Sequence, residues 1–216
     1  MTTACRSRCP RPRPRCPGGI SLVLLVLCAP PVAAAEIHEH NVDRSYSTTL
    51  QYRCLVSVPD DYQAAGEKRW PLILFLHGGG TPNLEKLQQT LKGLTALPAV
   101  VVIPICPPSA DGPRYTNWNS KHLGYVVREI GKEYRIDEKR RSVIGFSMGG
   151  SGAWELPSYE PELFSKCVVL AGVCHPWSLR HYPPTQVWVF VGEKDYMRKE
   201  QQETVTSAQR FGVDVV

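Results

Sequence analysis

The segment whose residue types and spacing point most clearly to a chemical role is a serine between two glycines, Gly145-x-Ser147-x-Gly149. It follows the apolar residues Val143 and Ile144, which are typical of a buried strand, and it precedes a sequence compatible with a helix. A serine at so sharp a strand-to-helix turn needs a strained backbone, and side chains at the flanking glycines would collide with the neighbouring strand and helix. The pattern therefore predicts a nucleophilic serine at a helix N-terminus, where a developing oxyanion is stabilised.

A second candidate element is the glycine-rich turn 77–80, which directly follows a continuous apolar run. Such a turn can direct backbone N–H groups at a carbonyl oxygen under attack. We expect Gly78 and Gly79 to supply these donors together with the N–H of Met148, the residue after the serine. For the side chain of His77 we expect a structural role within the loop.

A third candidate is an acid that follows the buried strand predicted over Gln186–Val191. This strand ends in a Gly-Glu-Lys-Asp turn, and Asp195 is placed to orient a catalytic histidine. Glu193 is a rival for that role, and either residue could instead be a solvated turn residue. The distance of Asp195 from the strand end favours Asp195.

The elements that must position these residues follow a simple order, because segments typical of strands alternate along the chain with segments typical of helices. A hairpin or edge strand is expected over 46–58, and strands at 71–76, 100–103, 141–146, 166–171 and 186–191. Helices are expected at 83–97, 120–134 and 201–211, and residues 213–216 read as the opening of a last, incomplete strand. Strands separated by helices pair in parallel through right-handed crossovers, so we predict an α/β fold with a mostly parallel sheet covered by helices on both faces.

The first thirty-five residues read as a signal peptide, with 36–216 forming a single domain. Five arginines precede an apolar run at 20–28 and the small-residue site Ala33-Ala34-Ala35. The apolar run is far shorter than the roughly 20 residues that span a bilayer, so we expect no stable membrane anchor after cleavage. The predicted location is secreted or periplasmic.

Removal of this segment also removes the excess positive charge, because the remaining basic and acidic residues are equal in number. The net charge of +5 therefore does not indicate a nucleic-acid partner. Four cysteines remain, Cys54, Cys106, Cys167 and Cys174, in a compartment that permits disulfides. The sequence does not choose among their three possible pairings. None lies in a Cys-x-x-Cys pair, which disfavours zinc binding or dithiol redox chemistry.

With these elements in order, the chain resembles the α/β-hydrolase superfamily. Within it, the chain is similar to secreted esterases and predicted peptidases of the dienelactone-hydrolase-like, prolyl-oligopeptidase-like and feruloyl-esterase or polyhydroxyalkanoate-depolymerase groups. The residues that carry the resemblance are the segments 76–80, 104–107, 117–118, 136–141 and 145–150 with Gly152 and Trp154. The resemblance implies hydrolysis of a small-molecule or polymer ester through an acyl-enzyme on Ser147, with no metal or organic cofactor.

The chain departs from this family in its general base, because relatives carry the triad in the order Ser, Asp, His and no histidine follows Asp195. The simplest interpretation is a chain truncated before the histidine loop, and inactive as it stands. His175 is the one plausible substitute, although its position is more typical of a pocket wall, a role we also consider for Trp118. Two alternatives stay open: a catalytically dead binding module and a secreted serine peptidase.

Overall fold

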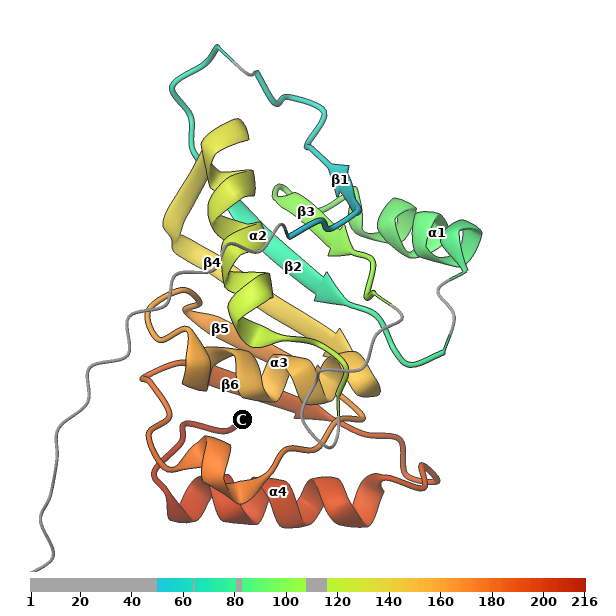
Figure 1. Ribbon diagram of the computed structural model, residues 1–216, viewed down its shortest axis with the longest axis vertical. Helices are drawn as coiled ribbons and strands as arrows, with labels where there is room; N and C mark the ends of the chain where they lie inside the picture. Colours follow the sequence, from blue (N-terminus) through green and yellow to red (C-terminus); the bar gives the residue numbers. More distant parts are fainter. Residues whose placement is uncertain (1–49, 64, 81–82, 108–115) are drawn as a thin grey trace, which may run out of the picture. The chain divides into compact units, whose positions relative to one another are not determined.

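The computed structural model describes residues 50–216 except 64, 81–82 and 108–115, and all of these belong to one compact unit, residues 47–216. The predicted signal peptide and the residues 46–49 of the predicted hairpin lie outside the described residues. The sheet has six strands in the order β1-β3-β2-β4-β5-β6. β1 is antiparallel to β3, and the other pairs are parallel, as the sequence predicts (Figure 1).

The strands and helices follow the predicted order. The strands are β1 (Cys54–Ser57), β2 (Trp70–Leu76), β3 (Val100–Pro104), β4 (Ile136–Phe146), β5 (Lys166–Leu170) and β6 (Gln186–Phe190). The helices are α1 (Leu84–Leu94), α2 (Ser120–Glu133), α3 (Met148–Tyr159) and α4 (Arg198–Arg210), with a 3₁₀ helix, η1 (Pro176–Leu179), before β6. None of the helices in the described part of the chain is long and apolar enough to cross a membrane.

The handedness of the crossovers explains which face each helix covers. The connection from β2 to β3 runs in one direction across the sheet. The connections from β3 to β4, from β4 to β5 and from β6 to residues 213–216 run in the opposite direction. Right-handed crossovers therefore place α1 on one face and α2, α3 and α4 on the other. α1 contacts β1 and β3, and α3 contacts β2, β4 and β5 (Figure 1). The prediction of helices on both faces is confirmed.

Alternation along β2 shows where the main core lies. Leu72, Leu74 and Leu76 have no exposed surface, while Ile73 and Phe75 are half-buried. Successive side chains of a strand point to opposite faces, so the leucines lie beneath α2 and α3. There they join the two fully buried tryptophans, Trp118 and Trp154.

Residues 213–216 lie beside β6, where the sequence predicts the opening of a further strand. Val215 forms a parallel bridge with Val187 of β6. The N–H of Val187 donates to Asp214 at 2.9 Å, and the N–H of Val216 donates to Val187 at 2.8 Å. Residues 213–216 therefore run beside β6 and in the same direction.

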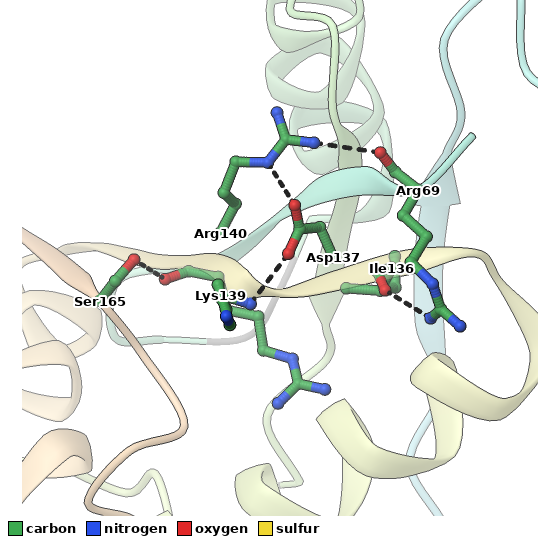
Figure 2. Close-up of polar contacts among 7 residues, drawn as sticks. Arg69, Ile136, Asp137, Lys139, Arg140 and Ser165 are labelled. Carbon is green, nitrogen blue, oxygen red and sulfur yellow. Dashed lines mark hydrogen bonds and ion pairs between the residues drawn. The ribbon is translucent and has the colours of Figure 1, made fainter.

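β4 begins five residues earlier than predicted, because the charged residues at its start form hydrogen bonds with one another. The register with β2 shifts between Trp70 and Leu72, so β4 carries extra residues there. Figure 2 shows how Asp137 holds this irregular stretch: its carboxylate accepts from Arg140 at 2.6 Å and from the N–H of Lys139 at 3.0 Å. The hydrogen bond from Arg140 is the main reason why the pKa of Asp137 is lowered.

The four cysteines within the described residues are free thiols, and three of them are buried. Burial raises the pKa of Cys167 to about 12, and its Sγ donates to the carbonyl of Ala153 at 3.1 Å. Cys167 therefore behaves as a small core residue, one of the readings its strand position allows.

We expect Leu74→Ala to lower the free energy of unfolding by about 2–5 kcal/mol, since truncation of a fully buried leucine leaves a cavity. The neighbouring Ile73→Ala is the matched control, because Ile73 lies on the less covered face and should lose clearly less. Urea unfolding of both variants measures the difference. Equal losses would contradict the assignment of the core to the α2/α3 face.

Candidate active site

Ser147 occupies a backbone conformation that L-amino acids rarely adopt. Its φ is 53° and its ψ is −119°, between the end of β4 at Phe146 and the start of α3 at Met148. These angles resemble the first central position of a type II′ turn, which normally requires glycine. The N–H of Ser147 donates to Leu170 of β5 at 2.8 Å, and its carbonyl accepts from Ser151 at 3.0 Å. The neighbouring strand and the helix therefore hold the strained residue in place.

The flanking glycines are required by close approaches of the backbone, as the sequence predicts. A Cβ on Gly145 would lie 2.0 Å from the carbonyl oxygen of Gly149, at the start of α3. A Cβ on Gly149 would lie 2.0 Å from the carbonyl oxygen of Leu76, at the end of β2. No side chain fits at either position, so the turn packs directly against the strand that leads into the glycine-rich loop.

The glycine-rich loop lies against both neighbours of Ser147. A Cβ on Gly78 would lie 3.2 Å from the ring of Phe146, and one on Gly79 would lie 3.7 Å from the Cβ of Met148. The structure thus brings together the backbone segments that carry the predicted oxyanion donors. They meet at the carboxyl edge of the sheet, where ligands bind in open α/β sheets.

His77 is a buried connector between this loop and its surroundings. Its Nε2 accepts the N–H of Cys106 at 3.1 Å, so Nδ1 carries the proton and donates to the carbonyl of Gly78 at 2.7 Å. Its own carbonyl accepts from the indole of Trp118 at 3.3 Å. Burial lowers the pKa of His77, which favours this neutral form. Both ring nitrogens are therefore engaged in holding the loop.

Trp118 does not line an open pocket, which corrects the sequence-based suggestion. It has no exposed surface, and its ring packs edge-on against His77 with 4.9 Å between centroids. A Cβ on Gly152 of α3 would lie 3.0 Å from it. Trp118 therefore fills the space between α3 and the loop, because an apolar indole with one hydrogen-bond donor suits a buried site beside a carbonyl.

Asp195 lies half-buried in the turn after β6. One carboxylate oxygen accepts the N–H of Met197 at 2.9 Å, and the backbone of Asp195 bonds to Gly192 and Arg198. Glu193 is exposed. β5 alone separates β6 from β4, so the strands that lead to Asp195 and to Ser147 lie about 10 Å apart and end at the same edge of the sheet.

His175 is exposed and is occupied by a local contact. Its Nδ1 accepts the N–H of Trp177 at 3.2 Å and so caps η1. A triad histidine donates its Nδ1–H to the acid, whereas here Nδ1 is an acceptor. Among the described residues, no histidine forms a hydrogen bond with the hydroxyl of Ser147.

Sequence reasoning missed the support that the loop after β5 gives to α3. Ala171 has a φ of 50°, and a Cβ on Gly172 would lie 2.4 Å from the carbonyl carbon of Gly150. The hydroxyl of Ser151 accepts the N–H of Val173 at 3.1 Å. An Ala-Gly pair directly after a buried strand was the available signal for this close approach. In the described part of the chain, no group of three or more His, Cys, Asp or Glu side chains could hold a metal ion.

The parallel sheet, its crossover helices and the strained serine turn together define an α/β-hydrolase fold. Residues 45–210 match the model of a family described as "Putative esterase". The chain therefore belongs to this esterase family, as its sequence resemblance implies.

Solved structures of esterases share the fold. A thermostable esterase is 27% identical with a TM-score of 0.63, and the match covers 78% of this chain and 50% of that chain, so this chain spans half its length. S-formylglutathione hydrolase (FrmB) from Staphylococcus aureus is 15% identical, with a TM-score of 0.62 and coverage of 76% and 88%. A ferulic acid esterase is 16% identical, with a TM-score of 0.56 and coverage of 77% and 89%. No curated protein sequence gives a significant match.

We expect Ser147→Gly to raise the free energy of unfolding by about 0.5–2 kcal/mol, because glycine adopts a positive φ without strain and this gain exceeds its extra entropy when unfolded. Ser147→Ala keeps the strain and is the control, with no comparable gain. Chemical denaturation of the two variants measures the effect. Equal stability of the two variants would show that the turn stores no strain.

We expect Gly149→Ala to lower the free energy of unfolding by more than about 3 kcal/mol, since its methyl group would overlap the carbonyl of Leu76. Gly93→Ala is the matched control, because a Cβ at this position of α1 meets nothing within 4 Å. That change should stabilise the protein by up to about 1 kcal/mol. Thermal unfolding distinguishes the two, and a tolerated alanine at 149 would refute the close approach.

Burial raises the pKa of Glu155 on α3 to about 7. The folded state therefore retains this proton more strongly than the unfolded chain, whose glutamate titrates near 4.3. Relative to Glu155→Gln, the contribution of Glu155 to stability should be complete below about pH 4 and decline, by up to about 3 kcal/mol, as the pH rises through 7. Unfolding of both proteins between pH 4 and 8 measures this difference, and a constant difference would contradict the raised pKa.

Proposed function

We propose that this chain carries the acylation machinery of a serine hydrolase that acts on carboxylic esters. Ser147 is the nucleophile, the N–H groups of Met148 and Gly79, with Gly78 beside them, bind the oxyanion, and Asp195 orients a histidine. The observation that carries the proposal is the positive φ of Ser147 at a turn that glycine would occupy without strain. Membership of the esterase family supports the reaction class.

In the proposed reaction, the hydroxyl oxygen of Ser147 attacks the ester carbonyl while its proton passes to the histidine base. The tetrahedral oxyanion is held by the backbone N–H groups until the alkoxide leaves with that proton. The acyl group is then bound as an ester to the hydroxyl oxygen of Ser147. A water molecule, deprotonated by the same base, releases the carboxylic acid and restores the serine.

We propose that the histidine base comes from outside the described residues. His77 and His175 use their ring nitrogens in other bonds, as described above. Residues 213–216 run parallel to β6, so they point toward the carboxyl edge of the sheet, where Asp195 lies. A histidine at this edge must lie between Asp195 and Ser147 to be within hydrogen-bonding reach of both.

The proposed substrates are soluble esters or the ester ends of polymers. The connection between β5 and β6 contains η1 alone among helices, so it holds no large lid over the site. Secretion through cleavage of residues 1–35 is part of this proposal, because an extracellular esterase meets such substrates.

We expect the 216-residue chain to hydrolyse p-nitrophenyl acetate with little or no Ser147-dependent rate, and imidazole added to the buffer to raise that rate. Free imidazole supplies the base that the proposal requires. Ser147→Ala is the control, since it keeps only the direct reaction of imidazole with the ester. Asp195→Asn should leave the imidazole-dependent rate nearly unchanged, because free imidazole does not need orienting by the acid.

Each outcome of this experiment supports a different interpretation of the chain. Hydrolysis that depends on Ser147 without imidazole, and is lost in His175→Ala, would place the base at His175. No Ser147-dependent hydrolysis under any condition would favour the catalytically dead binding module. Where Ser147-dependent hydrolysis is seen, comparing an ester with an anilide of the same acyl group distinguishes an esterase from a peptidase, since the anilide needs protonation of a worse leaving group.

A further inference from the structure

Two side-chain hydrogen bonds hold the carbonyl groups of the glycine-rich loop. The indole N–H of Trp118 donates to the carbonyl of His77 at 3.3 Å, and Nδ1 of His77 donates to the carbonyl of Gly78 at 2.7 Å. Each of these carbonyls shares a rigid, planar peptide unit with the N–H of the next residue. Because these peptide bonds are trans, that N–H points in the opposite direction from the carbonyl. The two hydrogen bonds therefore set the directions of the N–H groups of Gly78 and Gly79.

The N–H groups that are directed in this way have no acceptor within the described residues. The same is true of the N–H of Met148, the first residue of α3, so three such donors lie on adjoining segments. A Cβ on Gly79 would lie 3.7 Å from that of Met148, which shows how close the two segments are. Backbone donors of folded proteins are usually paired, so an unpaired group of this kind suits a negatively charged oxygen.

The two side chains that hold the carbonyls are themselves fixed in place. Trp118 has no exposed surface, and a Cβ on Gly152 of α3 would lie 3.0 Å from it. Nε2 of His77 accepts the N–H of Cys106 at 3.1 Å, so the imidazole cannot turn without losing a second hydrogen bond. Since α3 also begins with Met148, the indole relates the loop donors to the donor at the start of the helix. The directions of the donors are thus set before any ligand binds.

We propose that Trp118 and His77 are positioning residues of the oxyanion site. Trp118 orients the N–H of Gly78. His77 orients the N–H of Gly79. Both act through the peptide units that they hold, not through contact with the substrate. The inference rests on the proposed function, because it concerns the donors that are assigned there to the oxyanion. Such donors stabilise charge that develops only in the transition state, so the two side chains should control kcat and leave KM nearly unchanged.

The kinetic test compares two buried tryptophans. Trp118→Phe removes the donor to His77, whereas Trp154→Phe removes an equally buried indole whose Nε1 has no hydrogen-bond partner among the described residues. With p-nitrophenyl acetate at a fixed imidazole concentration, we expect Trp118→Phe to lower kcat at least about tenfold with KM nearly unchanged, and Trp154→Phe to retain kcat. A benzothienyl analogue of tryptophan at position 118, with sulfur in place of the N–H, keeps the packing and should reproduce the loss if the phenylalanine variant does not fold.

Two substitutions of His77 separate its two hydrogen bonds. The amide of asparagine can take the place of Nδ1 and donate to the carbonyl of Gly78. The amide of glutamine takes the place of Nε2, where it can accept from Cys106 but does not reach Gly78. We therefore expect His77→Asn to retain most of kcat and His77→Gln to lose about tenfold. A merely structural role of His77 would alter stability without this difference in kcat.

A second measurement needs no turnover, because it follows the loop itself. In protein with isotopically labelled glycine, NMR order parameters report how rigidly the N–H groups of Gly78 and Gly79 are held, with a value of about 0.85 for a rigid backbone. We expect the order parameter of Gly78 to fall below about 0.6 in Trp118→Phe, and that of Gly79 to fall similarly in His77→Gln. Both values should be retained in Trp154→Phe.

The two measurements together decide the inference. Order parameters that stay unchanged in Trp118→Phe and His77→Gln would overturn it, as would a retained kcat despite a mobile loop, or an equal loss of kcat in Trp154→Phe. If the order parameters fall as expected but the unsubstituted chain shows no Ser147-dependent hydrolysis, the proposed function fails, while the orientation of the two N–H groups by Trp118 and His77 is supported.

Discussion

The contact on which the candidate site depends is the approach of α3 to the end of β2. Because Gly149 lies against the carbonyl of Leu76 with no room for a side chain, the serine turn and the glycine-rich loop are fixed by one backbone-to-backbone contact. The same tight packing continues on the other side, where Gly150 meets Gly172 after β5. Three adjacent strand ends are therefore locked around Ser147, which lets the fold tolerate its positive φ.

Polar contacts extend this lock to the rest of the loop. The ring of His77 links its own loop to Cys106, and the indole of Trp118 donates to the carbonyl of His77. The arrangement works only with a neutral imidazole that donates from one nitrogen and accepts at the other. Burial provides that condition by lowering the pKa of His77. A histidine next to a candidate oxyanion hole thus serves the backbone rather than the chemistry.

Local patterns were enough to predict most of the fold. The apolar runs of β2, β3 and β6 and the glycine spacing around Ser147 predicted the strands and, through the crossover rule, a mostly parallel sheet covered by helices. The order of the strands in the sheet came from the structure. Features set by tertiary contact were not predictable in this way. In the sequence, a buried loop tryptophan looks the same as one that lines a pocket. Trp118 is buried because α3 packs over it, and this contact forms only in the folded structure. The charged start of β4 carries no strand signal, because its bonds to Asp137 arise only when the bulge forms.

The direction of chain crossing also determines where the candidate site lies. Every crossover after β3 carries the chain toward β6, so the residues proposed for catalysis gather at the carboxyl ends of β2, β4 and β6. β1 is left behind at the opposite edge, antiparallel and paired on one side within the described residues. The candidate site is therefore built without β1, from the segments that follow β2, β4 and β6.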